Sequence, residues 1–222
     1  MKRIVSTVLA VCLVLSLLFC GPFSALAANR DESLSGNLLV VDNAGLLSSR
    51  ECEALEQTAQ TISSAHDCEV IILTANGTGG KNAREYAEDY FIDHDYGFGT
   101  DRNGIMLFLD MGERDYHLAT RGSAISAFPD NTLLFLESRF LPDLSDGDYA
   151  EAFETYLDYS DKILGVADNS LSQSEYEALN GEYNAYMNGG SSDDEPVLDS
   201  GSYTHNLLLI FFAVIILLNL VF

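Results

Sequence analysis

Between residues 38 and 165 of this 222-residue chain, short continuous runs of apolar residues alternate with stretches in which apolar residues recur every three or four positions. Short apolar runs at 38–41, 69–74 and 104–109 predict strands, and the unbroken run 104–109 is typical of a central strand covered on both faces. Residues 116–121 alternate between apolar and polar, which predicts a fourth strand antiparallel to the third. Between the first three runs the spacing lengthens to three or four residues, which predicts connecting helices.

The first predicted helix begins at a capping box, in which Ser48 is followed three residues later by Glu51. Further helices are predicted around 83–91, 131–139 and 146–164. This order of elements predicts an α/β fold, a three-layer α/β/α sandwich with a mixed, mostly parallel sheet. Helical crossovers make its first three strands parallel.

The two ends of the chain are apolar and predict processing and anchoring. Residues 1–27 have the layout of a signal peptide, with two basic residues, an apolar run and a small-x-small site at 25–27. Lipoprotein processing at Cys20 is the alternative, although Phe19 stands where that pathway requires a small residue. Residues 206–222 predict a C-terminal transmembrane helix, since this run lacks the regularly spaced polar positions of a core helix.

Three segments lie between these ends. Residues 28–37 predict a flexible N-terminus, and 38–165 predict the folded domain. Residues 166–205 predict an acidic flexible linker that contains a short helix at 172–179. We therefore expect an exported protein that is anchored to the cell membrane with its domain outside the cytoplasm.

The chain is strongly acidic, with 34 Asp and Glu against 11 Lys and Arg and a net charge of −23. This charge excludes nucleic acid as a partner, because binding phosphate requires a basic surface. An acidic exported domain suits cation binding, a basic partner, or solubility alone. Two cysteines follow the signal, Cys52 and Cys68, and the helix predicted between them would hold them about 20 Å apart. Both are therefore expected to be buried free thiols.

Nucleotide binding is not predicted by the glycine-rich loop at 76–81. Gly80 and Lys81 fit a phosphate-binding loop, but Ala75 replaces its first glycine and Asn82 its hydroxyl residue. Serine hydrolase chemistry is not predicted either, because no G-x-S-x-G elbow occurs in the sequence. Aspartyl phosphatases use a second Asp two residues after a strand-end Asp, whereas Gly112 follows Asp110 at that distance.

An acidic loop provides the strongest chemical prediction. Asp93, Asp95, Asp101 and Asn103 offer four oxygen ligands within eleven residues, which suits a hard divalent cation, Ca²⁺ above all. Asp42 is a separate candidate at the opposite edge of the sheet. The spacing does not match an EF-hand, and a solvated acidic loop is the alternative.

Several short motifs follow one another in a specific order. They are Val-Asp-Asn-Ala-Gly-Leu-Leu-Ser at 41–48, Tyr-Gly-Phe-Gly at 96–99, Asn-Gly-Ile at 103–105 and a late segment at 141–149. With these motifs in this order, residues 38–165 resemble the TPM-domain family. The resemblance implies an α/β/α sandwich held outside the cytoplasm, usually with a signal peptide and a membrane segment.

The family resemblance also implies activities. Some members are described as acid phosphatases of the thylakoid lumen linked to photosystem repair, others bind calcium, and one animal branch modulates a receptor channel. The motif positions that carry over are Asp42 and the turn at 101–104. The chain departs from the family after Arg121, where members tend to have a glycine-rich stretch.

Two functions therefore remain open. The first is a cation-binding accessory module for a membrane-protein partner, which the anchor and linker favour because tethering raises local concentration. The second is a metal-assisted acid phosphatase acting on exported phosphoesters or phosphoproteins, which the family resemblance favours. Lys81, Arg102 and Arg121 are the cations available to bind phosphate in that case.

Overall fold

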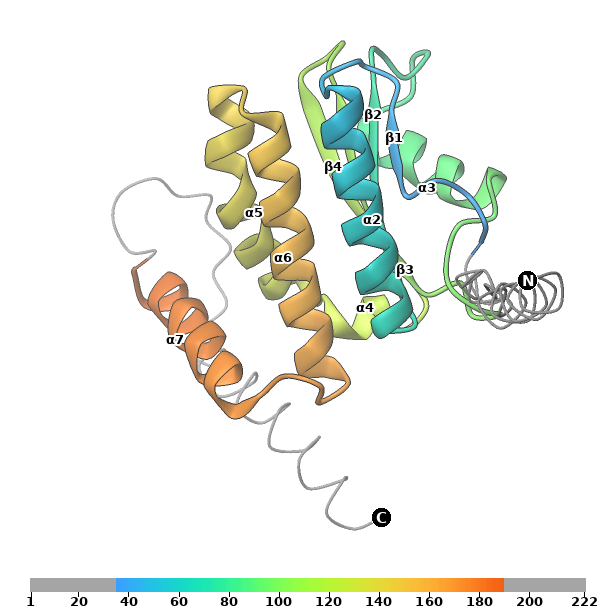
Figure 1. The fold of residues 1–222 in the computed structure, drawn as a ribbon. Helices are drawn as coiled ribbons and strands as arrows, with labels where there is room; N and C mark the ends of the chain where they lie inside the picture. The colour runs from blue at the N-terminus through green and yellow to red at the C-terminus, as the bar shows by residue number, and fades with distance from the viewer. Residues whose placement is uncertain (1–34, 190–222) are drawn as a thin grey trace, which may run out of the picture. The chain divides into compact units, whose positions relative to one another are not determined.

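The computed structural model describes residues 35–189 (Figure 1). This part has an α/β fold built on a mixed four-stranded sheet. Its strands are β1 (Val40–Asp42), β2 (Glu69–Ala75), β3 (Gly104–Asp110) and β4 (Asp115–Arg121). The spatial order is β1-β2-β3-β4, with the first three parallel and β4 antiparallel to β3. The predicted strands and their directions are confirmed.

Six helices accompany the sheet in the described part: α2 (Ser49–Ala65), α3 (Ala83–Asp93), α4 (Ala124–Ala127), α5 (Asp130–Asp146), α6 (Tyr149–Ala167) and α7 (Gln173–Gly189). Figure 1 shows α2 and α6 in front of the sheet and α3 behind it. Aromatic contacts agree, because Phe108 of β3 stacks on Tyr86 of α3 while Tyr116 of β4 meets Phe140 of α5. Every residue of β2 and β3 is buried, as expected of strands covered on both faces.

The α2 helix begins as the sequence predicts. Ser48 Oγ accepts a hydrogen bond from the Glu51 N–H (3.3 Å), and the Ser48 N–H donates to Glu51 Oε2 (2.7 Å). This reciprocal pair satisfies two backbone groups that the first turn leaves without helical partners. The helix buries Leu55, Ala59 and Ile62 against the core.

Helix α5 is longer than the predicted helix at 131–139 and continues through Pro142. Proline normally ends a helix because it lacks the N–H for the backbone bond. Here Leu136, Phe140 and Leu144 form a buried stripe at intervals of four residues across the proline. Burial of that stripe outweighs the lost backbone bond. The helix ends at Gly147, whose φ of +87° is left-handed.

Helix α7 corrects the prediction of a flexible linker that begins at residue 166. The expected short helix at 172–179 is 17 residues long, and the compact unit runs to Tyr183. Leu179 and Tyr183 are buried, with the Tyr183 ring edge-on to Phe135 of α5 at 5.3 Å between centroids. Glu182 also accepts hydrogen bonds from Arg139 and Tyr159. Such contacts between distant segments are not visible in local sequence composition.

Both cysteines are free thiols, as predicted. Cys68 is buried, and burial raises the pKa of its thiol to about 12. Cys52 is only half-buried, which differs from the expectation.

Within residues 35–189, no helix is both long and apolar enough to cross a bilayer. The predicted signal peptide at 1–27 and transmembrane run at 206–222 lie outside the described residues.

Candidate functional site

Asp42 lies at the end of β1, where the parallel strands bring their carboxyl ends together. Its Oδ1 accepts a hydrogen bond from Thr74 Oγ1 (2.5 Å), and its Oδ2 accepts one from the Leu47 N–H (2.9 Å). The same Thr74 oxygen accepts a bond from the Ala44 N–H (3.0 Å). These bonds fix the loop between β1 and α2, so the structure gives Asp42 a positioning role.

Asp110 ends β3 at the same edge and is 1% exposed. Its Oδ1 accepts a hydrogen bond from the Gly112 N–H (2.8 Å), which closes the turn into β4. Gly112 lies directly against Gly77, since a Cβ added at Gly112 would meet the Gly77 backbone at 3.1 Å. The glycine-rich loop therefore packs on this turn.

The opposite edge of the sheet holds the residues expected to bind a cation. Asp95 Oδ1 accepts a hydrogen bond from Arg102 Nη2 (2.8 Å), and the Asp95 carbonyl accepts one from Nη1 (2.5 Å). Asn103 uses both amide atoms, accepting from the Ser123 N–H (2.9 Å) and donating to the Asp67 carbonyl (3.3 Å). Two of the four expected ligands therefore already have protein partners.

Asp93 and Asp101, the other two expected ligands, are exposed. In the described part of the chain, no group of three or more His, Cys, Asp or Glu side chains is arranged to hold a metal ion. The cation site thus stays a prediction from the sequence.

Each of the three basic residues available to bind phosphate has a local contact. Lys81 pairs with Asp89 (2.6 Å) and Arg102 with Asp95 (2.8 Å). The Arg121 guanidinium lies over the Phe91 ring, 5.6 Å from its centroid. These contacts stabilise α3 and the turns next to it rather than a shared phosphate position.

A groove of about 500 Å³ runs beside β4, the edge strand. Five consecutive β4 residues, from His117 to Arg121, line it together with residues of α3, α4 and α5. Two of its lining side chains are large, apolar and exposed: Ile92 of α3 (55%) and Ile125 of α4 (58%). Exposed apolar groups gathered in one hollow are typical of a contact surface for another molecule.

The charged residues that line this groove balance one another. Arg84 and Arg121 stand against Glu88 and Asp130. Burial lowers the pKa of His117, and the nearby Arg84 lowers it further, so this side chain is neutral at pH 7. The groove is therefore a neutral, partly apolar region of a chain whose net charge is −23.

The sequence analysis missed this groove. One feature of the sequence pointed to an exposed apolar surface, since Ile92 lies outside the apolar face predicted for residues 83–91. A single exposed isoleucine does not by itself predict a binding surface. Its significance arises when the fold places it beside Ile125, more than thirty residues away, at a free sheet edge.

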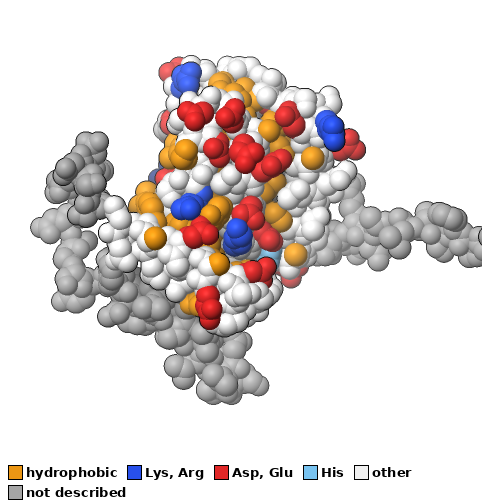
Figure 2. Space-filling model, turned by 60° about the vertical axis from the view of Figure 1, so that its left-hand side comes forward, with side chains coloured by type: hydrophobic (Ala, Val, Ile, Leu, Met, Phe, Trp, Pro, Cys, Tyr) orange, Lys and Arg blue, Asp and Glu red, His pale blue; other side chains and the backbone are white. Residues whose placement is uncertain are grey.

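One face of the molecule carries a cluster of acidic side chains. Figure 2 shows carboxylates gathered on the side of the molecule where α5 and α6 lie, with few basic side chains among them. Glu151, Glu154 and Asp158 of α6 are exposed and contribute to this charge. Such a surface keeps a protein soluble and attracts basic partners over a distance.

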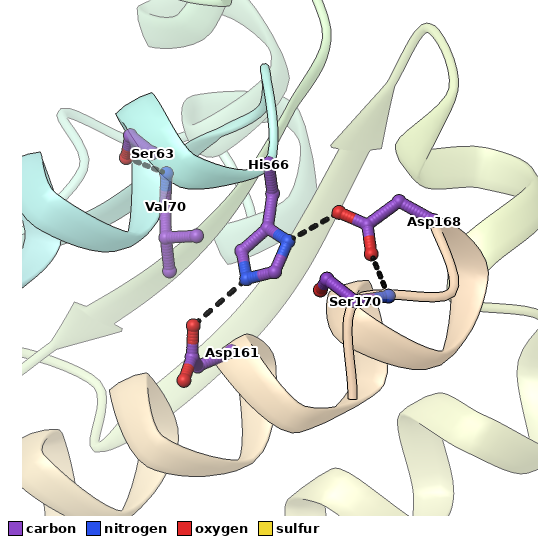
Figure 3. A network of polar contacts seen from close by, with 6 residues as sticks. All are labelled: Ser63, His66, Val70, Asp161, Asp168 and Ser170. Carbon is purple, nitrogen blue, oxygen red and sulfur yellow. Dashed lines mark hydrogen bonds and ion pairs between the residues drawn. The ribbon is translucent and has the colours of Figure 1, made fainter. Parts of the chain in front are cut away.

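His66 forms a second polar cluster at the end of α2 (Figure 3). Its Nδ1 lies 2.6 Å from Asp168 Oδ2 and its Nε2 lies 2.8 Å from Asp161 Oδ1, although the His66 side chain is only 6% exposed. Burial lowers the pKa of His66, but hydrogen bonds to Asp168 and Asp161 outweigh burial and raise it overall. The cluster links the ends of α2 and α6.

Known proteins resemble this chain in sequence and in fold. The TPM domain model matches residues 40–163. The UPF0603 protein YdjH of Bacillus subtilis (strain 168) is 30% identical over 157 residues, a match that covers 71% of this chain and 59% of that protein. The N-terminal domain of a P. gingivalis protein, solved by NMR, has a TM-score of 0.52 and 23% identity, covering 64% of this chain and 87% of that domain.

Proposed function

The chain belongs to the TPM-domain family, and from this premise we propose that it is an exported, membrane-tethered module that binds a protein partner. The observation that carries the proposal is the neutral groove beside β4, with Ile92 and Ile125 exposed in it. The apolar runs at the two ends of the sequence support export and tethering.

Exposure of these two isoleucines argues for a ligand that covers them. Moving a large aliphatic side chain from water into an interface contributes about 1.5–3 kcal/mol when burial is complete. Groups of this kind, surrounded by polar residues such as Glu88 and Asp130, form the apolar centre and polar rim of a typical protein interface.

Site-specific photo-crosslinking tests the binding site. A photoreactive amino acid is placed at Ile125 in cells that make the full chain, and at Leu134 as the matched control. Leu134 is 51% exposed on α5 but does not line the groove. We expect a covalent adduct with a second protein from position 125 only, and loss of that adduct when Ile92→Asp is added. Identical adducts from both positions would contradict the proposal.

A phosphatase assay tests the alternative function. Hydrolysis of p-nitrophenyl phosphate is measured with calcium, magnesium or manganese present, and we expect no rate above that of buffer. A rate that Asp42→Asn removes, with the variant still folded, would favour the metal-assisted phosphatase instead.

Processing and tethering have their own test. We expect the mature chain to begin at Ala28, after the small-x-small site, and to sediment with membranes. Mass spectrometry of the N-terminus and fractionation of cells check the two parts. Recovery of the full chain in the soluble fraction would rule out the anchor.

A further inference from the structure

We infer that β4 accepts an extended segment of the partner protein as a fifth strand of the sheet, and that this segment has an apolar centre and basic flanks. The inference rests on the proposed function and specifies how the partner is held. Three features carry it: the direction of the backbone groups of β4, the side chains on both sides of the strand, and the charge of the molecule.

The hydrogen bonds of β3 determine which backbone groups of β4 point away from the sheet. The Met111 N–H donates to the Ala75 carbonyl (2.8 Å). The Asn103 carbonyl accepts from the Glu69 N–H (3.0 Å). Odd-numbered residues along β3 therefore direct their backbone groups toward β2, and even-numbered residues direct them toward β4.

Those even-numbered residues of β3 lie opposite the odd-numbered residues of β4. The backbone groups of Tyr116, Leu118 and Thr120 therefore point outward, away from β3, and Leu118 and Thr120 line the groove. The Tyr116 N–H donates to the carboxylate of its neighbour Asp115 (2.9 Å). No hydrogen bond joins the outward N–H and C=O groups of Leu118 or Thr120 to another residue between 35 and 189. A free edge of this kind is a template for an added strand.

Side chains on the two faces of the sheet define the centre of the added segment. Successive residues of a strand point to opposite faces. On one face the segment would meet Ile92 of α3, and on the other it would meet Leu133 of α5, with Ile125 beside the end of the strand. Apolar side chains therefore suit both faces at the middle of the segment.

Charge selects the flanks and argues against a second copy of this chain as the occupant. The two basic and two acidic residues that line the groove cancel in charge, so a charged residue at the centre of the segment would not be favoured there. The whole chain carries a net charge of −23, which attracts basic residues outside the groove and repels another copy. A segment with Lys or Arg on both sides of an apolar centre fits both conditions.

The probe is the labelled peptide KKVTVTVTVKK, and its binding to the full chain in detergent micelles is followed by fluorescence anisotropy. Two further peptides carry methyl groups on alternate backbone nitrogens, one on the odd positions and the other on the even positions. We expect one of the two to bind about tenfold or more weakly, because its methyl groups replace the N–H donors that face β4, and the other to bind almost as well as the parent. Equal binding of the two methylated peptides, or no binding of the parent peptide at millimolar concentration, would overturn the inference.

A matched pair of variants tests the same contact from the protein side. Thr120→Pro removes an outward N–H without removing a bond to β3, and edge strands tolerate proline at such positions. Thr120→Val keeps the N–H. We expect Thr120→Pro to weaken binding by about tenfold and Thr120→Val by less than about threefold. Circular dichroism confirms that both variants fold, and the methylated peptides provide the test if Thr120→Pro does not.

The outcomes separate this inference from the proposed function. If Ile125→Asp weakens peptide binding while Thr120→Pro and backbone methylation do not, the groove binds its partner without adding a strand. If none of these changes matters, both proposals fail. Formation of dimers that Thr120→Pro abolishes, measured by light scattering of the full chain, would identify a second copy as the occupant and overturn the choice of partner.

Discussion

His66 shows how one side chain can connect two helices in a way that depends on pH. Both of its ring nitrogens face carboxylates, Asp168 at 2.6 Å and Asp161 at 2.8 Å. Neutral imidazole has a single N–H, so only the protonated ring can donate to both partners. The arrangement therefore favours the charged form in the folded state and opposes the cost of burying it.

Replacing this histidine should remove a pH-dependent part of the stability. The pKa of His66 is raised by folding, so its contribution is fully present below its unfolded pKa of about 6.5 and is lost as pH rises through the folded pKa. We expect His66→Gln to lower the free energy of unfolding by about 1–2 kcal/mol near pH 5.5 and by less at pH 8.5. The loss at pH 5.5 is no larger because solvent screens both partly exposed carboxylates. Urea unfolding at the two pH values measures this.

Asp168 sets the lower pH limit of the range in which this cluster stabilises the fold. Burial raises its pKa, but bonds to Ser170 and His66 outweigh burial and lower it, so its contribution is lost as pH falls through its folded pKa. Asp168→Asn in the His66→Gln background should add little, since the two residues act together. A pH-independent effect of His66→Gln would indicate a packing role only.

Gly122 is a position where a side chain cannot be accommodated. Its φ is +60°, and an added Cβ would lie 2.2 Å from Asn103 Oδ1, the atom that accepts the bond from Ser123. We expect Gly122→Ala to lower the free energy of unfolding by about 2–4 kcal/mol, from left-handed strain together with the broken bond. Gly147→Ala is the control, because its φ is also positive but no atom lies within 4 Å, and it should cost about 1 kcal/mol. Equal losses in the two variants would show that the contact with Asn103 is unimportant.

At the scale of elements, α7 matters because it lies beyond the region that the sequence marks as folded. The ring of its buried Tyr183 lies edge-on to Phe135 of α5, and its Glu182 accepts a hydrogen bond from Arg139 (3.2 Å). These contacts join α7 to the structure that carries the groove, since Leu133 of the groove belongs to the same α5.

Shortening a buried residue of α7 tests whether the helix belongs to the cooperative unit. Leu179 is 8% exposed, and Leu179→Ala should lower the free energy of unfolding by about 2–3 kcal/mol. Glu177→Ala, at an exposed position of the same helix, should change it by less than about 0.5 kcal/mol. If the two variants unfold at the same urea concentration, α7 detaches before the rest of the domain unfolds.

At the scale of the whole molecule, the contacts of the acidic loop decide whether its charge can bind a cation. The acidic loop holds Asp95 on Arg102, so the guanidinium already provides the positive charge that a bound ion would supply. A cation bound there would compete with Arg102 for Asp95 and with the Ser123 N–H for Asn103 Oδ1. The contacts in the structure thus compete with the predicted ion.

We therefore expect millimolar calcium to leave the melting temperature of the full chain unchanged, and Arg102→Ala to make it sensitive to calcium. Thermal melts with calcium or with a chelator check this. A gain of about 2.7 kcal/mol at a hundredfold excess over Kd in the unaltered chain, abolished by Asp101→Ala but kept in Asp143→Ala, would instead establish the cation site that the sequence predicts.

Local sequence patterns were enough to predict the four strands, their directions and the places of α2, α3, α5 and α6. Residues 104–109 read as a central strand because both faces are apolar, and Ser48 with Glu51 marked the start of α2 because the capping box is local chemistry. Helical crossovers then required the first three strands to be parallel. Each of these conclusions depends on residues close together in the chain or on general rules of chain connection.

The continuation of α5 past Pro142, the docking of α7 and the surroundings of β4 depend on tertiary packing. Burial of Phe140 and Leu144 outweighs the local tendency of proline to end a helix. Arg102 pairs with Asp95 because the loop between α3 and β3 folds back on itself. Ile92 lies in one groove with Ile125 because folding brings separate segments together. The partner of a charged residue and the exposure of an apolar side chain are set by packing. Neither can be derived from the composition or the spacing of residues along the chain.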